Sequence, residues 1–218
     1  MISSGELKKY LVEAIGTFAL VFAGTGAIIS NDLSSGAVGV VGIALVFGSI
    51  VAVMIYALGD ISGAHMNPAV TIGFCVARGF AVKKALGYVL SQIVGALAAS
   101  LCLRFLFFNH PLLGVTQPKY SVLQSAVLEL LLTFLLMFVI LNVTRGTKEK
   151  GLTAGLAIGA TVGLEALFAG PISGASMNPA RSLAPAIVSG HLQHLWIYIV
   201  APFGGAMLAC FCSKFSED

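Results

Sequence analysis

Charged residues are scarce in this chain of 218 residues, and their scarcity excludes a water-soluble globular protein. Asp, Glu, Lys and Arg make up 10% of the sequence, whereas soluble domains contain about 25%. Hydrophobic residues make up 58% and the mean hydropathy is +0.98, so too little polar surface remains to cover one buried core. The net charge of +3 comes from dispersed residues, which excludes a nucleic-acid-binding surface. The composition predicts an integral membrane protein with several spans.

Reactive and metal-binding clusters are also missing from the sequence. Its four cysteines show neither CxxC nor metal-ligand spacing and lie in or beside apolar stretches, which is typical of inert packing residues: Cys75, Cys102, Cys210 and Cys212. No nucleophile and base can be paired from the motifs. We therefore expect no enzyme, no cofactor and no bound metal.

Six apolar stretches are long enough for transmembrane helices, which need about 17–25 residues. They cover residues 9–30, 38–58, 82–108, 120–142, 152–169 and 193–214. The first stretch lacks an early cleavage site, so we expect it to be retained as a helix. A cytoplasmic N-terminus places nine of the twelve basic residues on the cytoplasmic side: Lys8, Lys9, Arg78, Lys83, Lys84, Arg145, Lys148, Lys150 and Lys214. We expect a multi-pass protein of the cell membrane with both termini in the cytoplasm.

Two further segments, residues 61–78 and 172–190, are too apolar for exposed linkers and too short to span the bilayer. Segments of this kind are typical of re-entrant structure. Backbone that ends at membrane depth is tolerated only where protein buries it or where it lines a watery cavity. The two segments are therefore the first indication of a functional site.

An internal repeat relates these two segments. Residues 61–69 (ISGAHMNPA) and 172–180 (ISGASMNPA) are identical at eight of nine positions, with a constant offset of 111. We expect one domain over residues 1–218, made of repeats 1–110 and 111–218. With three spans in each repeat, the second repeat inserts upside down, so the re-entrant segments enter from opposite faces and meet near the midplane.

Each re-entrant segment contains the signals that begin a helix. Proline suits the first helical position, and the asparagine before it suits the N-cap. Two short helices meeting end to end would bring their positive ends together, repel cations and protons, and offer amide donors to a passing oxygen. The residues expected at this midplane are Asn67, Pro68, Ala69, Asn178, Pro179 and Ala180.

The two Asn-Pro-Ala boxes, in the contexts SGAHMNPAVT (62–71) and SGASMNPARS (173–182), resemble the aquaporin, or major intrinsic protein, family, as do the six spans. The stretches LFAGPISGASMNPARSLAPA (167–186) and WIYIVAP (196–202) are similar to its nodulin-type branch and bacterial relatives. The resemblance implies an all-α membrane protein of six transmembrane helices and two re-entrant half-helices. It also implies a homotetramer with one pore per subunit, which passes water and small neutral solutes and excludes ions and protons.

By the same resemblance, four residues form the selectivity filter: Phe47, Ala166, Ala175 and Arg181. A buried basic residue such as Arg181 is by itself a functional hypothesis. Strict water channels resemble each other in having His where Ala166 stands, and often Cys where Ala175 stands. Two alanines should widen the constriction for glycerol, other polyols or metalloid hydroxides. Glycerol facilitators, however, resemble each other in having Asp where this chain has Ser182. The resemblance therefore does not choose among water, glycerol-like polyols and metalloid hydroxides as the permeant.

Four further polar residues lie in the apolar regions. By resemblance His65 lines the pore, although a histidine packed on the re-entrant loop is an equal alternative. Glu13 and Glu129 lie at matching places in the two repeats, which suits carboxylates that accept hydrogen bonds from the re-entrant backbone. Glu165 adjoins Ala166 and is the acid to test for the main alternative, a coupled secondary transporter with an inverted-repeat fold.

Overall fold

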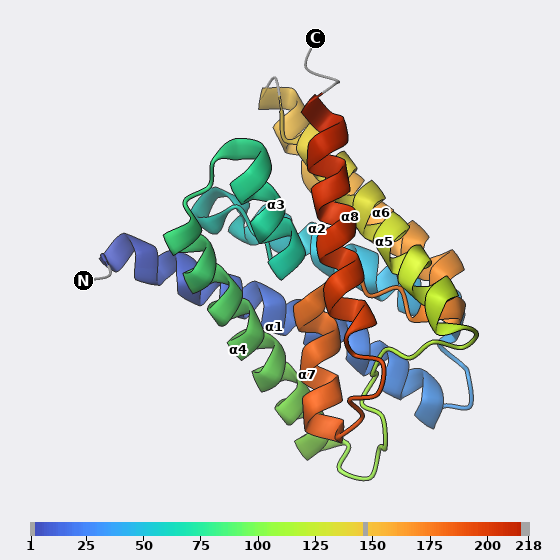
Figure 1. The fold of residues 1–218 in the computed structure, drawn as a ribbon. Helices are drawn as coiled ribbons and strands as arrows, with labels where there is room; N and C mark the ends of the chain where they lie inside the picture. Colours follow the sequence, from blue (N-terminus) through green and yellow to red (C-terminus); the bar gives the residue numbers. More distant parts are fainter. Residues whose placement is uncertain (1–2, 146–147, 215–218) are drawn as a thin grey trace.

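The computed structural model describes residues 3–145 and 148–214, and within them the chain forms eight α-helices and no strand (Figure 1). Side chains are described for residues 3–145 and 153–213, so the side chains of Lys148, Lys150 and Lys214 lie outside the described residues. The helices are α1 (Ser4–Leu33), α2 (Gly39–Ser62), α3 (Pro68–Arg78), α4 (Val82–Leu106), α5 (Val122–Val143), α6 (Lys148–Ser173), α7 (Pro179–Ser189) and α8 (Ile197–Lys214).

The six long helices correspond to the six predicted spans and confirm the all-α fold. Five of them, α1, α2, α4, α5 and α6, are long and apolar enough to cross a membrane. Helix α8 has 18 residues and is about 27 Å long, close to the thickness of the hydrocarbon core. Helices α2 and α6 continue to Ser62 and Ser173, a few residues beyond the predicted ends of their spans, and each is followed by a glycine with positive φ.

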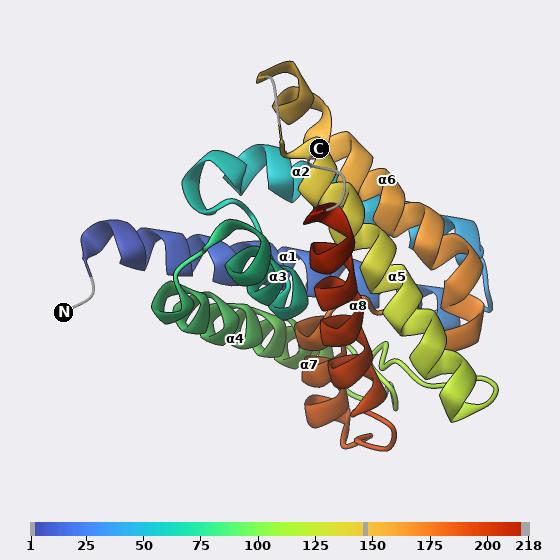
Figure 2. The ribbon, with the colours of Figure 1, turned by 45° about the horizontal axis from the view of Figure 1, so that its top comes forward.

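The two short helices, α3 and α7, have 11 residues each and are therefore about 16 Å long. Both lie among the long helices, beside α8 (Figure 2). Each begins with a proline after an asparagine N-cap and ends at a glycine with positive φ, Gly79 or Gly190. They end at Arg78 and Ser189.

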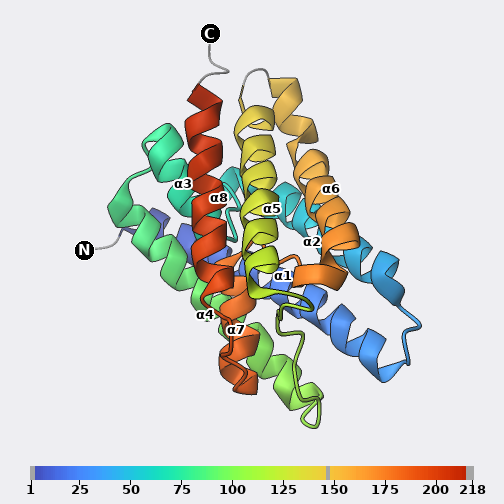
Figure 3. The same cartoon turned by 45° about the vertical axis from the view of Figure 1, so that its right-hand side comes forward.

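Close helix pairs occur at matching places in the two halves of the chain. A Cβ on Gly95 of α4 would collide with the Ala14 carbonyl oxygen of α1, and a Cβ on Gly205 of α8 would collide with the Leu130 carbonyl oxygen of α5. Glycine at these two positions lets each pair pack backbone against backbone. Figure 3 shows the resulting row, in which α5 lies between α8 and α6.

Candidate pore site

A buried carboxylate holds the loop before α3. Glu13 of α1 is fully buried, and its Oε1 accepts hydrogen bonds from Ser62 Oγ at 2.7 Å and from the His65 N–H at 2.9 Å. Its Oε2 accepts from the Met66 N–H and from Gln92 Nε2, both at 2.8 Å. The carboxylate thus provides acceptors for buried backbone donors that have no helical partner.

Glu129 of α5 has the same place beside the loop before α7. Its Oε1 accepts from Ser173 Oγ at 2.7 Å and from the Ser176 N–H at 2.9 Å, and its Oε2 accepts from the Met177 N–H at 2.9 Å. The structure therefore places both predicted carboxylates against re-entrant backbone. Each loop contains two non-glycine residues with positive φ, an unfavourable conformation that the surroundings must hold: Ala64 and Met66, and Ala175 and Met177.

The two asparagines of the boxes connect the loops to each other. Asn67 Nδ2 donates to the Met177 carbonyl, and Asn178 Nδ2 donates to the Met66 carbonyl, both at 2.8 Å. The side-chain oxygen of each accepts from the backbone N–H two residues later, which fixes the orientation of the amide. An amide nitrogen carries two N–H groups, so these hydrogen bonds leave one N–H of each asparagine unused at the wall of the central cavity.

The N-terminal ends of α3 and α7 meet where these hydrogen bonds cross. Pro68 and Pro179 occupy the first turns, and Ala69 and Ala180 are almost completely buried beside them. Each helix end carries the equivalent of about half a positive charge from its unpaired N–H groups. The meeting point is therefore electropositive and has two oriented amide donors.

Two cavities meet at the four residues predicted to form the filter. The central cavity, of about 100 Å³, is lined by both box asparagines and by apolar side chains of the long helices. A second cavity, the vestibule, has a volume of about 320 Å³, and its lining includes the polar residues Asn31, Asp32, Gln117 and Lys119. The lining residues that the two cavities share are Phe47, Ala166, Ala175 and Arg181. The structure thus brings these four together at the boundary between the cavities.

Arg181 is held at this boundary in one orientation. Its side chain is almost completely buried, and Nη1 donates to the Gly114 carbonyl at 2.9 Å. The guanidinium carbon lies 5.1 Å from the centroid of the Phe47 ring, within the range of a cation–π contact. Within the described residues, Nε has no hydrogen-bond partner. A positively charged side chain is therefore held at the boundary between the two cavities.

The remaining boundary residues are small. Ala166 of α6 and Ala175 of the second loop present methyl groups only, and each is buried apart from its cavity surface. Helices α2 and α6 carry Phe47 and Ala166 and approach closely, since a Cβ on Gly159 would lie 2.5 Å from the Gly48 carbonyl oxygen. Close packing of the two helices thus sets the distance across the boundary.

His65 lines the central cavity and is also satisfied by its neighbours. Its Nδ1 lies 3.2 Å from Thr71 Oγ1, and its ring stacks on Phe74 at 4.6 Å between centroids. The rings of Phe80 and Tyr88 lie at 5.2 and 5.0 Å. The ring of His65 is therefore packed on the re-entrant loop and also forms part of the wall of the central cavity.

Glu165 differs from the other two buried glutamates. It is buried in α6 beside Ala166, and within the described residues neither carboxylate oxygen has a hydrogen-bond partner. It is also absent from the described linings of both cavities.

Sequence reasoning missed two tyrosines and the contact partner of Arg181. Tyr88 Oη donates to the Ser62 carbonyl at 2.7 Å, and Tyr198 Oη donates to the Ser173 carbonyl at 2.6 Å. The two tyrosines are 110 positions apart, almost the offset of the boxes, so a longer comparison of the halves would have found them. Nothing local in the sequence marks Gly114 as the acceptor for Arg181.

Within the described residues, no disulfide joins the four cysteines, and Cys210 is the one that is fully buried. Among the described residues, no group of three or more His, Cys, Asp or Glu side chains is placed to share a metal ion.

Comparisons with known proteins agree with this geometry. The model of the family described as major intrinsic protein matches residues 1–213. Aquaporin NIP1-1 of Oryza sativa subsp. japonica is 47% identical over 202 residues, covering 92% of this chain and 71% of the relative, and Nodulin-26 of Glycine max is 43% identical over 208 residues, covering 95% and 77%. The X-ray structure of the aquaglyceroporin from Plasmodium falciparum superposes with a TM-score of 0.84 at 26% identity and 94% coverage of both chains. The chain therefore belongs to the major intrinsic protein, or aquaporin, family and matches its nodulin-type branch.

Proposed function

We propose that the boundary formed by Phe47, Ala166, Ala175 and Arg181 is the selectivity filter of this channel, and that it admits glycerol-like polyols as well as water. As a family member, the protein is a membrane channel for water and small neutral solutes. The observation that carries the filter assignment is the sharing of these four residues by the two cavities. A solute that passes between the cavities must pass them.

The small side chains support a permeant larger than water. Two methyl groups face a path whose polar contact is the Arg181 guanidinium, so a polyol finds hydrogen-bond donors on one wall and apolar surface on the other. The solved relative is named an aquaglyceroporin, which favours glycerol over the other permeants left open by the sequence.

Exclusion of ions and protons follows from the charge distribution along the path. A cation would meet the guanidinium of Arg181 and then the positive ends of α3 and α7. A file of water molecules would be interrupted at Asn67 and Asn178. One N–H of each amide donates to the Met177 or Met66 carbonyl, and the other would donate to a water oxygen and turn the hydrogens of that water outward. We assign the chain no catalytic activity.

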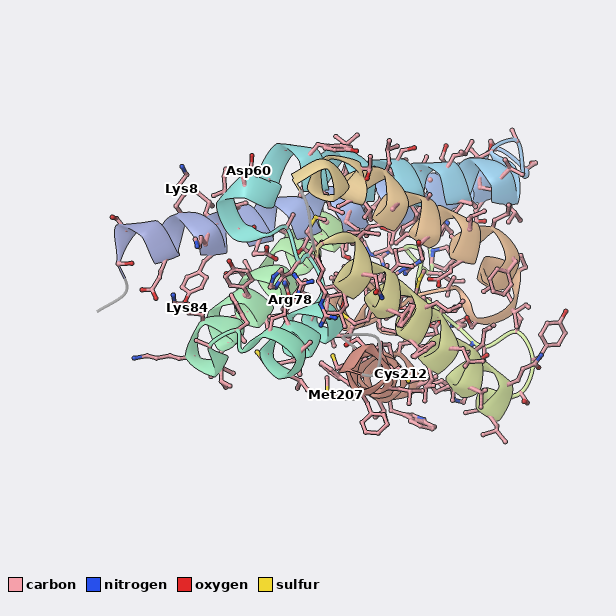
Figure 4. All side chains as sticks on the ribbon, turned by 90° about the horizontal axis from the view of Figure 1, so that it is seen from above. Lys8, Asp60, Arg78, Lys84, Met207 and Cys212 are labelled. Carbon is pink, nitrogen blue, oxygen red and sulfur yellow. The ribbon has the colours of Figure 1, made fainter. Side chains whose placement is uncertain are left out.

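We further propose a homotetramer in the plasma membrane, with both termini in the cytoplasm. The assembly rests on the family resemblance. The orientation is supported by Lys8 and Lys84, which lie at the end of the bundle from which α1 begins (Figure 4). Native mass spectrometry and labelling of single cysteines from either side of intact cells would test both points.

The test of the filter is Ala166→His, compared with Ala166→Ser. Purified protein is reconstituted into liposomes, and water and glycerol permeabilities are measured by stopped-flow light scattering. An imidazole in the path should reduce glycerol flux far more than water flux, whereas serine keeps the width and should leave the ratio near that of the wild type. Unchanged glycerol flux in the histidine variant would show that Ala166 does not line the path.

A further inference from the structure

The connection between α4 and α5 supplies the acceptor that fixes Arg181. Within the described residues, the Gly114 carbonyl is the hydrogen-bond acceptor of the guanidinium. Gly114 has φ 74°, and a Cβ there would lie 2.7 Å from Thr25 Cβ of α1. The peptide is therefore pressed against α1 in a conformation that only glycine adopts readily. The position of this carbonyl decides where the guanidinium lies.

The preceding residue is held in an unfavourable conformation. Leu113 has φ 51°, a value that bulky side chains rarely adopt, and it is completely buried. Its side chain packs with Ile29 of α1 and Leu103 of α4. Its backbone N–H donates to His110 Nδ1 at 3.0 Å. Apolar packing and one imidazole acceptor thus hold the Leu113–Gly114 peptide.

His110 is itself fixed from both sides. Its side chain is 6% exposed, and Nε2 lies 3.3 Å from Asp32 Oδ2 at the end of α1. Arg104 Nη1 of α4 donates to the His110 carbonyl at 2.8 Å and to the Phe108 carbonyl at 3.1 Å. Because Nδ1 accepts from Leu113, the ring proton lies on Nε2 and points at Asp32. These contacts form an unbroken series from Asp32 to the filter.

We propose that His110 is a positioning residue for the filter: through Leu113 and Gly114, its Nδ1 holds the Arg181 guanidinium against the wall of the path. The inference rests on the proposed function, in which Arg181 lines the constriction. Without the Nδ1 acceptor, the buried Leu113 N–H is unpaired and the left-handed turn relaxes. The Gly114 carbonyl then moves, and the released guanidinium spreads across the opening, which excludes glycerol more strongly than water.

Three variants of His110 separate the acceptor from mere occupation of the site. In His110→Asn, the side-chain oxygen lies near the position of Nδ1. In His110→Gln, it lies near the position of Nε2. The His110→Ala side chain has no acceptor. We expect Asn to keep the wild-type ratio of glycerol to water permeability. We expect Gln and Ala to lower this ratio about tenfold. This is the change in the population of the wild-type Arg181 position that is expected when the charged guanidinium loses its hydrogen bond to the Gly114 carbonyl. If Ala does not fold, the comparison of Asn with Gln decides.

The same variants in an Arg181→Ala background separate the two proposals. If Arg181→Ala changes the permeability ratio and His110→Gln has no further effect in that background, the series acts through the guanidinium as proposed. Equal ratios for wild type, Asn and Gln would overturn the role of His110 and leave the filter assignment intact. A ratio unaffected by Arg181→Ala would overturn the filter itself. An effect of His110→Gln that persists without the guanidinium would overturn the route through Arg181.

Discussion

The substitution Glu129→Gln measures how much one buried carboxylate contributes to holding the second re-entrant loop. The carboxylate accepts from Ser173 Oγ and the Ser176 N–H through Oε1, and from the Met177 N–H through Oε2. Glutamine keeps one oxygen and replaces the other by an NH₂ group. In its best orientation, the NH₂ group faces the Met177 N–H. The NH₂ group and the Met177 N–H are then two buried donors without an acceptor.

The magnitude follows from these two donors. An unsatisfied buried donor costs about 1–3 kcal/mol, so the pair should destabilise the folded state by about 3 kcal/mol. For a chain of this length, 1 kcal/mol lowers the unfolding midpoint by about 2–4 °C, which predicts a decrease of about 6–12 °C. Differential scanning fluorimetry of the purified protein in detergent measures this midpoint.

Glu165→Gln is the matched control, because it is the same substitution at a buried glutamate whose oxygens have no hydrogen-bond partner within the described residues. No hydrogen bond is lost, so the midpoint should stay within about 2 °C of the wild type, a change of under about 1 kcal/mol. Equal decreases in both variants would show that burial of the amide, and not the loss of acceptors for the loop, explains the effect. No decrease in Glu129→Gln would refute the anchoring role directly.

Three further predictions concern the filter and the helices around it. Gly24→Ala places a methyl group against the Phe47 ring and should push the ring into the path, so that glycerol flux falls severalfold more than water flux in the stopped-flow assay. Gly26→Ala is the control, because a methyl group there makes only ordinary contacts and should change neither flux. Gly159→Leu should separate α2 from α6 and lower the unfolding midpoint by about 2–12 °C, since overpacking costs about 1–3 kcal/mol. An unchanged midpoint would contradict the close approach of the two helices. Arg181→Val should increase the proton permeability of the liposomes, measured as the change of internal pH reported by a pH-sensitive dye. An unchanged proton permeability would show that the positive ends of α3 and α7 are sufficient to exclude protons.

The local signals in the sequence predicted the half-helices well. Whether an asparagine caps a helix that begins at the following proline depends on the backbone of only a few neighbouring residues. The helix starts at Pro68 and Pro179 were therefore predicted from the sequence, and the structure confirms them. The ends of α2 and α6 were predicted too early. The helices stop at the glycines of the two ISG motifs, where a positive φ ends the helix, and Pro171 is accommodated one turn earlier.

The support of the filter could not be predicted in this way. Arg181 and Gly114 are 67 positions apart, and the contact depends on how the α4–α5 connection packs on α1. The hydrogen bond from Leu113 to His110 depends on a backbone conformation that leucine rarely adopts, so no propensity indicates it. Within the part of the chain that the structure describes, the Glu165 carboxylate has no hydrogen-bond partner, and this too depends on the packing of whole helices.

The most direct test of the central claim is the dependence of glycerol flux on its driving force. Liposomes with the wild-type protein are followed over a wide range of glycerol gradients, at several temperatures, with and without an imposed proton or sodium gradient. A passive path predicts a flux that rises linearly with the glycerol gradient, ignores both ion gradients and has a low activation energy. A flux that saturates and responds to either ion gradient, and loses that response in Glu165→Gln, would identify a coupled transporter and contradict the channel.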